Sequence, residues 1–329
     1  MIRALYFSPA SRLEMEYPVD KFKKALRNRK GLLWVDFSGE PNETCEPILR
    51  EIFRFHPLAV DDALQETHVP KVDDWGDYLY IVLNALDFDE TLTNGTLHTH
   101  ELDVFLGRNF VVTHHDRPFQ AIEQAWVACQ RDDRHTRSGA DHLLYKIVDY
   151  LVAAYMPIVE QIDREIDDIE DQIFYKPVPG TLESLFALKR ALLSMRRVIT
   201  PQREVLNKLA RDDYRVIDPH DRIFFRDVYD HLVRLHDLNE SMRDLVSGAL
   251  DTYLSVINNR LNEVMKTLTV ITSVFMPISF IAGFFGMNFF EPTAHLLNWT
   301  SSPAFYVTLA ITIFLPISMF LWMRRRTWV

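Results

Sequence analysis

The chain has 329 residues and a formal net charge of -10, with 48% hydrophobic and 25% charged residues. These values describe a folded protein of about two domains. The acidic balance suits cationic ligands and argues against a nucleic-acid partner, because phosphate binding requires clustered Lys and Arg. Cys45 and Cys129 are the only cysteines, which excludes a disulfide framework and a CxxC metal site.

The first part of the chain, residues 1–140, is predicted to be a cytosolic α/β domain. It starts without a basic stretch followed by an apolar one, so we expect no signal peptide. Segments 31–39, 78–89 and 101–115 are rich in β-branched and aromatic residues, and "GRN" within the last of them predicts a hairpin. Residues 56–65 are predicted to form a helix.

The sequence "HTHE" at 98–101 places His98 and His100 at alternating strand positions. Two such histidines can ligate a transition metal, but alternating histidines on a strand are more often ordinary surface residues. The sequence leaves their role open.

Residues 141–266 are predicted to form a cytosolic helical stalk. Its first long helix has an acidic face, "KPVPG" at 176–180 turns the chain, and the next helix is basic, so we expect an αα-hairpin with complementary charges. The acidic face is either a solvated surface or one that concentrates cations. Four isoleucines at steps of four, three and four mark the apolar stripe of this first helix: Ile162, Ile166, Ile169 and Ile173.

A third helix is predicted to begin near Pro219 and to continue into a membrane. From 220 to 288 it would measure about 100 Å, and a helix of that length cannot bury its apolar stripe alone. A bundle of identical subunits, with the stripes meeting on a central axis, would bury it. The stripe consists of Met242, Val246, Ala249, Tyr253, Val256, Arg260 and Val264.

Two segments without charged residues, 267–290 and 304–323, are predicted to be transmembrane helices, because each reaches the length that spans a bilayer. Two buried helices of a soluble core are the alternative. Basic residues flank the segments on their outer sides, at Arg260 and Lys266 and in the tail 324–329, whereas the loop 291–303 has no Lys or Arg. The positive-inside rule therefore predicts a hairpin with both termini in the cytoplasm and an extracytoplasmic loop.

Small and polar residues share one face of the first span and continue on the cytosolic side. This stripe is either a packing surface between helices or the lining of a pore, and its absence from the second span favours a pore surrounded by an outer ring. Asn288 lies at the outer end, where one carboxamide per subunit would form a ring at the mouth. The stripe consists of Asn258, Asn262, Met265, Thr269, Thr272, Met276, Ser279 and Gly283.

The motif "GMN" at 286–288, preceded by "LNEVMKTLTVITSVFMPISFIAGFF", resembles the CorA family of divalent-cation transporters. The segments "FFRDVYDHL", "HVPKVDDW" and "RRRTWV" also resemble that family. The resemblance implies a funnel-shaped homopentamer with a large cytosolic α/β domain and passive uptake of Mg²⁺, Co²⁺ and Ni²⁺. Phe285 stands where the family usually has Tyr, and Ser279 where it often has Thr.

The resemblance also implies roles for individual residues. Gly286, Met287 and Asn288 would form the selectivity filter, which would hold hydrated Mg²⁺ through its water shell. Independently of the resemblance, Met276 and Leu268 are expected to form apolar constrictions that close by dewetting. Mg²⁺ would be both the substrate and a regulatory ligand, without an organic cofactor. Asp227 matches a position at which the family senses cytosolic Mg²⁺, and Asp89 is the expected partner.

Two other functions remain open at this point. The first is zinc transport by the ZntB branch of the same family, although an intact "GMN" argues mildly against it. The second is a membrane-anchored sensor that conducts nothing, which the polar stripe argues against. An enzyme is not expected, because no nucleophile–base constellation or Walker-type sequence is present. The cell (inner) membrane is the expected location.

Overall fold

The computed structural model describes residues 1–8, 13–65, 68–88, 97–132, 134–175, 180–287 and 302–326, which form two compact units, Met1–Leu250 and Asp251–Val329. The strands are β1 Ile2–Phe7, β2 Leu13–Met15, β3 Leu32–Ser38, β4 Lys71–Asp74, β5 Tyr78–Phe88, β6 Leu97–Gly107 and β7 Phe110–His115. The helices are η1 Val19–Lys21, α1 Phe22–Arg27, α2 Asn42–Pro47, η2 Ile48–Phe53, α3 Pro57–Gln65, α4 Gln120–Arg131, α5 Arg134–Arg137, α6 Ala140–Ala153, α7 Tyr155–Tyr175, α8 Thr181–Arg211, α9 Arg222–Gly286 and α10 Ser302–Arg325.

The seven strands form one mixed sheet in the order β2-β1-β3-β7-β6-β5-β4. Neighbouring strands are antiparallel except β3 and β7, which run parallel. The hairpin predicted around "GRN" is confirmed, with Gly107 opposite Phe110. A Cβ atom at position 107 would collide with the Phe110 ring, so a glycine is required at this turn.

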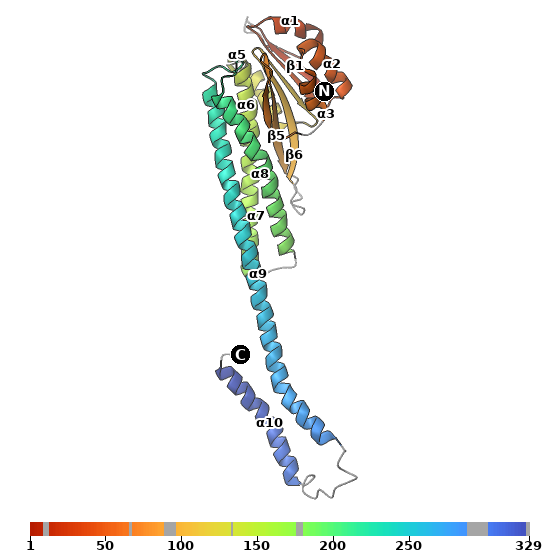
Figure 1. Ribbon diagram of the computed structural model, residues 1–329, viewed down its shortest axis with the longest axis vertical. Helices are drawn as coiled ribbons and strands as arrows, with labels where there is room; N and C mark the ends of the chain where they lie inside the picture. The colour runs from red at the N-terminus through yellow and green to blue at the C-terminus, as the bar shows by residue number, and fades with distance from the viewer. Residues whose placement is uncertain are drawn as a thin grey trace. The chain divides into compact units, whose positions relative to one another are not determined.

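Helices cover both faces of the sheet, which explains why β3 is an almost continuous apolar run. On one face, Val35 and Phe37 join a core with Phe22 of α1 and Val60 of α3. On the other face, α8 contacts β4, β5 and β6, and α6 contacts β6 and β7. Figure 1 shows α1, α2 and α3 on one side of the sheet and α6 and α8 on the other. The helices that follow residue 140 therefore belong to the same compact unit as the sheet.

A buried carboxylate, Asp36, joins β1, β3 and β7 at the centre of the sheet. It is 0% exposed, and it accepts hydrogen bonds from Arg3 Nε at 2.9 Å and Thr113 Oγ1 at 2.5 Å. His115 Nε2 lies 3.1 Å from the same carboxylate. Burial alone would raise the pKa of Asp36, but the hydrogen bonds from His115 and Thr113 and the nearby charges lower it below its ordinary value.

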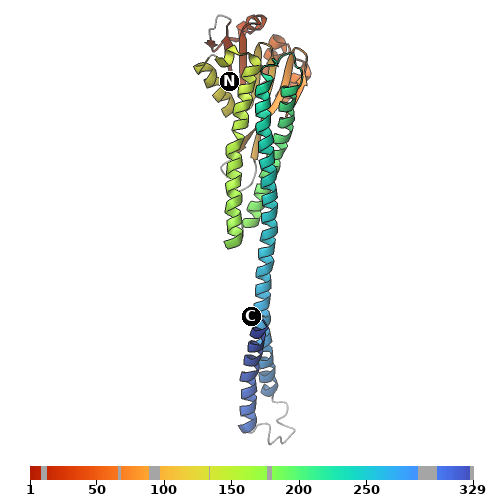
Figure 2. The same ribbon diagram turned by 90° about the vertical axis from the view of Figure 1, so that its left-hand side faces the viewer.

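The helical hairpin of α7 and α8 has the apolar stripe that the isoleucine spacing predicted. Ile162 and Ile173 are 0% and 1% exposed, whereas Asp163 and Asp171 on the other face are exposed. Figures 1 and 2 both show α7, α8 and the first part of α9 running lengthwise next to one another. On α8, Arg196 Nε lies 3.4 Å from Glu240 of α9.

Helix α9 has 65 residues, which corresponds to about 98 Å along its axis. It begins at Arg222, after the expected start near Pro219, because Asp218 Oδ1 accepts the His220 N–H and holds a turn there. Its buried residues recur at steps of three and four and end at Ala249. They are Phe225, Val228, Leu232, Leu235, Asn239, Met242, Val246 and Ala249.

The part of α9 beyond residue 250 buries none of its residues in the single chain. Three helical segments of the described residues are long and apolar enough to cross a membrane: Ala140–Tyr175, Arg222–Gly286 and Phe305–Arg325. The apolar window of the first is 56% buried within its own unit, whereas those of the other two are 0% and 6% buried. The first segment therefore has protein around it already, and the other two present their apolar surface outward.

Replacing Asp36 with Asn should lower the free energy of unfolding by about 3 kcal/mol, because it leaves buried partners of the carboxylate without a counter-charge. The pH dependence should change as well. Since the pKa of Asp36 is lowered in the folded state, its contribution is present at neutral pH and is lost as the pH falls through that lowered pKa. Urea unfolding of the full chain, followed by tryptophan fluorescence between pH 3 and 7, measures both effects.

Glu123→Gln is the matched control, because Glu123 pairs with the same Arg3 but its side chain is 52% exposed. An exposed pair is worth at most about 1 kcal/mol. Equal losses in the two variants would show that burial at Asp36 carries no special weight.

Candidate functional site

The residues of the expected pore lining lie along one side of α9. At 3.6 residues per turn, they occupy an arc of roughly 120° on the helix surface. Leu268 and Gly286 lie at one edge of the arc, and Asn258, Met265 and Met276 lie nearer its middle. Opposite the arc, from residue 270 onward, the helix is apolar, at Ile271, Val274, Ile278 and Phe285.

The threonine hydroxyls of this arc are held by the helix itself. Thr269 Oγ1 donates to the Met265 carbonyl at 2.7 Å, and Thr272 Oγ1 donates to the Leu268 carbonyl at 2.8 Å. Each hydroxyl thereby uses its one proton within the helix and keeps oxygen lone pairs directed away from it. The arc therefore offers fixed oxygen acceptors, which suit a cation or the hydrogens of its water shell.

Large apolar side chains alternate with these hydroxyls. Met265, Leu268 and Met276 are 60%, 55% and 65% exposed in the single chain. An added Cβ at Gly283 would meet no atom within 4 Å, so that position is open on the same side. If several copies of the arc face one another, these methionines and the leucine form rings that can exclude water.

The C-terminus of α9 supplies further oxygen atoms. The helix ends at Gly286, and the Met287 N–H contacts the Phe284 carbonyl at 3.4 Å. The last carbonyls of a helix lack intrahelical partners and form the negative end of its dipole, which attracts cations. Gly286 does not have a positive φ. Asn288 lies outside the described residues.

Helix α10 lacks a comparable stripe. Its hydroxyls are scattered, and Thr312 Oγ1 and Ser318 Oγ donate to the carbonyls of Thr308 and Leu315 at 2.8 Å each. Most of its apolar residues are exposed. The helix is therefore suited to an apolar surrounding on nearly all sides.

The expected sensor residue, Asp227, is exposed on the N-terminal part of α9. It lies about 200° around the helix from the buried Phe225, on the side that faces away from the domain core. Asp89, its expected partner, is outside the described residues.

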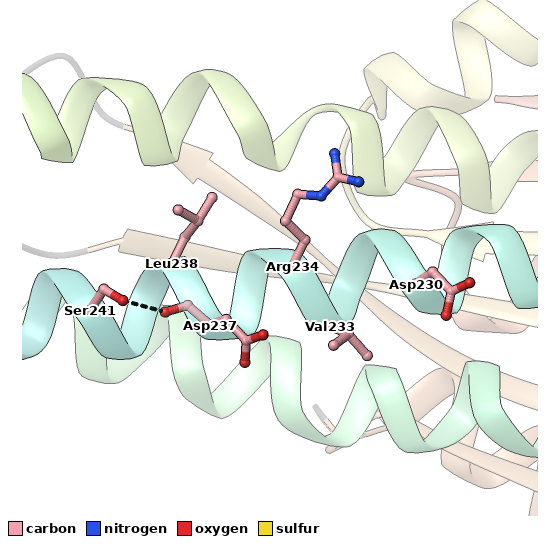
Figure 3. Close-up of a pocket in the computed structure, with 6 residues that line it drawn as sticks. All are labelled: Asp230, Val233, Arg234, Asp237, Leu238 and Ser241. Carbon is pink, nitrogen blue, oxygen red and sulfur yellow. Dashed lines mark hydrogen bonds between the residues drawn. The ribbon is translucent and has the colours of Figure 1, made fainter.

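Asp227 continues a face of α9 that includes a groove of about 470 Å³. The groove is lined by Asp230, Val233, Arg234, Asp237, Leu238 and Ser241. In Figure 3, Arg234 and Leu238 extend from one side of α9 and Val233 from the other, and Ser241 donates to the Asp237 carbonyl at 3.0 Å. Of this face only Asp227 was predicted from the sequence, although Asp227, Asp230, Arg234 and Asp237 recur at steps of three and four.

The histidines of "HTHE" do not form a metal centre with other described residues. His98 is exposed, and His100 Nε2 lies 3.6 Å from Asp87. Among the described residues, no three His, Cys, Asp or Glu side chains are arranged to hold a metal ion.

Comparison with known proteins gives matches over nearly the whole chain. The family model described as "CorA-like Mg2+ transporter protein" matches residues 29–325. A cobalt/magnesium transport protein CorA from Thermotoga maritima is 32% identical over 330 residues, covering 96% of this chain and 91% of that protein. A zinc transport protein ZntB from Yersinia pseudotuberculosis is 26% identical over 285 residues, covering 86% and 82%.

A solved structure has the same fold. The complete structure of the CorA magnesium transporter from Methanocaldococcus jannaschii superposes with a TM-score of 0.81 and 22% sequence identity, covering 100% of this chain and 99% of that chain. At this identity the match establishes the fold and leaves the transported ion open.

The polar arc predicts which positions of α9 meet water in a membrane. Thr272→Cys should react with a membrane-impermeant maleimide, and Ile271→Cys, one residue away on the opposite side, should not. The native Cys45 and Cys129 are buried and give a low background. The measurement is the labelled fraction of each variant in sealed vesicles. Equal labelling at both positions would contradict an aqueous pathway along the arc.

Proposed function

The chain belongs to the family of CorA-like Mg²⁺ transporter proteins, and we propose that it is a passive channel for divalent cations, mainly Mg²⁺, with Co²⁺ and Ni²⁺ as further substrates. Members of this family are ion transporters rather than enzymes. The observation that carries the proposal is the arc of oxygen and small side chains that leads along α9 to its carbonyl end. A non-conducting anchor has no use for such an arc.

We propose that five copies assemble around the arc in the cell membrane, with both termini in the cytosol. Beyond Ala249, apolar residues are exposed in the single chain. Leu261, Val264 and Leu268, for example, are 57%, 63% and 55% exposed. Lipid can cover such residues inside the membrane. On the cytosolic side of the membrane, only protein can cover them. A ring of α9 helices provides that cover, and α10 then forms the outer, lipid-facing layer.

Gly286, Met287 and Asn288 form the filter in this proposal. Mg²⁺ sheds its waters reluctantly, so carbonyl and carboxamide oxygens that hydrogen-bond its water shell can select it without removing the waters. The carbonyls at the end of α9 lie next to this motif and favour positive charge. Carboxylates would hold the ion more tightly and slow its release.

Met276 and Leu268 form the gate, because rings of apolar side chains can close a narrow pore by excluding water. The driving force is electrical. At a potential of about 100 mV, inside negative, a divalent ion gains roughly 4.6 kcal/mol on entry. An ungated pore with that driving force would overload the cell, so a sensor of cytosolic Mg²⁺ is required.

We propose that Asp227 belongs to this sensor, between neighbouring subunits, with Asp89 as its partner. The support is its place on the exposed side of α9, where another copy of the chain can approach. Facing carboxylates repel one another without a cation and attract a divalent ion between them. Bound Mg²⁺ would then favour the closed arrangement by its higher affinity for that state.

Zinc is the second candidate ion, because a zinc transport protein is among the relatives. Uptake into proteoliposomes that contain the purified protein distinguishes the two ions, when Mg²⁺ and Zn²⁺ are measured in parallel with dyes selective for each. Uptake of Zn²⁺ without Mg²⁺ would replace the proposed substrate and leave the pathway unchanged.

Asn288→Ala should reduce Mg²⁺ uptake into proteoliposomes at least about tenfold, because a loss of about 1.4 kcal/mol in ion recognition corresponds to that factor. Oligomeric state, measured by size-exclusion chromatography with light scattering, should not change. Asn259→Ala is the matched control, since Asn259 lies on α9 outside the arc. Uptake near wild type in Asn288→Ala would remove Asn288 from the filter.

Asp227→Asn should weaken the protection that Mg²⁺ gives against limited proteolysis, so that the titration midpoint moves to higher Mg²⁺. Asp227→Lys supplies a fixed positive charge and should give protection at lower Mg²⁺. Asp171→Asn, an exposed carboxylate on α7, serves as control. Three superimposable curves for wild type and the two Asp227 variants would show that Asp227 is only a surface residue.

A further inference from the structure

A second polar cluster lies within the α/β part, apart from the proposed pathway. It borders a cavity of about 130 Å³ between the C-terminal end of α3 and the sheet. The charged or titratable side chains around the cavity are Glu101 and Asp103 on β6 and His114 and His115 on β7, followed by Asp116.

Strand geometry brings this cluster together. Glu101 and Asp103 are two residues apart and therefore point to the same face of β6. Asp103 pairs directly with His114 across the sheet, and the His114 Nδ1 to Asp103 Oδ2 distance is 3.5 Å. Tyr80 on β5 donates to Asp103 Oδ1 at 2.7 Å. Asp103 is 3% exposed, so its charge is balanced by these neighbours rather than by water.

Glu101 adds a second carboxyl group, which Tyr80 and His114 do not stabilise. Its side chain is 12% exposed and borders the same cavity as Asp103. Two ionised carboxylates have no donor between them, whereas one proton makes a carboxyl–carboxylate hydrogen bond. Burial and the adjacent Asp103 raise the pKa of Glu101 to about 7. Burial alone would lower the pKa of His114, but Asp103 raises it to about 9.

Glu101 also holds the segment that follows α3. It accepts the backbone N–H of His68, and His68 Nδ1 lies 3.5 Å from Glu101 Oε1. Lys71 at the start of β4 pairs with Asp62 of α3 and with Asp73, at 3.1 Å in the latter case. His68–Asp74 is thus attached by the backbone ladder between β4 and β5, and its N-terminal part also by polar contacts with β6 and α3.

Apart from His68, whose ring lies 3.5 Å from Glu101, the titratable groups near the cluster supply no further donor to the pair. Cys45 of α2 contacts His114, and Asp62 is 3.9 Å from His68 Nε2. His115 is engaged with Asp36 at 3.1 Å, and Asp116 is a further acid. Lys71 is held by its two acidic partners.

We propose that Glu101 and Asp103 bind one proton between them, and that its release loosens the attachment of segment 68–74 to the sheet. Protonated, the pair makes a hydrogen bond in a buried place. Deprotonated, two carboxylates repel each other there, and the strand and cavity must open to admit water. The pH on the side of the membrane that faces this domain thereby controls the local stability of the segment, independently of which ion the chain conducts.

Hydrogen exchange of the full chain, read by mass spectrometry for peptides covering 68–74, tests the proposal. After correction for the intrinsic pH dependence, exchange in wild type should be at least about tenfold faster at pH 8 than at pH 6, equivalent to one pKa unit of linkage. Glu101→Gln keeps a neutral hydrogen-bonding side chain and should show slow exchange with no such dependence. Glu14→Gln, an exposed carboxylate on β2, is the matched control and should behave as wild type.

A second variant covers the case in which Glu101→Gln does not fold. Asp103→Asn removes the repelling charge, so the midpoint of the remaining pH effect should move to lower pH. An exchange ratio near one in wild type, a wild-type ratio in Glu101→Gln, or an unmoved midpoint in Asp103→Asn would each overturn the proposal.

Discussion

Helix α9 must find partners for its apolar residues after it leaves the domain in which it starts. Up to Ala249 the sheet unit supplies them, through a stripe at steps of three and four. Beyond that point the helix continues without a break to Gly286, and none of its residues is buried in the single chain. The lipid-facing and protein-facing surfaces, the proposed ring of subunits and the proposed pathway all follow from this one uncovered length of helix, because each is a way of satisfying it.

Buried carboxylates on the two faces of the sheet differ in their protonation, because their hydrogen-bond donors differ. Asp36 has Arg3, Thr113 and His115 as donors and remains ionised. On the other face, Glu101 and Asp103 have fewer hydrogen-bond donors than two ionised carboxylates need. We therefore propose that the pair holds one proton. The difference is one of donor supply rather than depth, since Asp36 and Asp103 are 0% and 3% exposed. The neighbours of a buried carboxyl group therefore determine whether it stays ionised or changes its protonation with pH.

Elements with a strong local period could be predicted from the sequence. The isoleucine stripe of α7, the β6–β7 hairpin and the two apolar helices have signals within a few neighbouring residues. The short strands β1, β2 and β4 have no such period, and the parallel pairing of β3 with β7 joins segments that are far apart in the chain. For the same reason neither carboxylate cluster was foreseen: Asp36 meets Thr113, and Asp103 meets Tyr80, only through strand register. The polar arc was foreseen because a single helix generates it, whereas the role of Asp227 depends on a second chain.

The threonines of α9 have a consequence for how such a protein is made. Thr267, Thr269 and Thr272 donate their hydroxyl protons to carbonyls four residues earlier in the same helix. Their polarity is therefore satisfied before any neighbour arrives, and the cost of placing them in hydrocarbon falls. A newly synthesised chain can enter the bilayer as a monomer and meet its partners afterwards by lateral diffusion. Insertion and assembly are then separate steps, and Thr269 and Thr272 of the proposed pore do not obstruct the first of them.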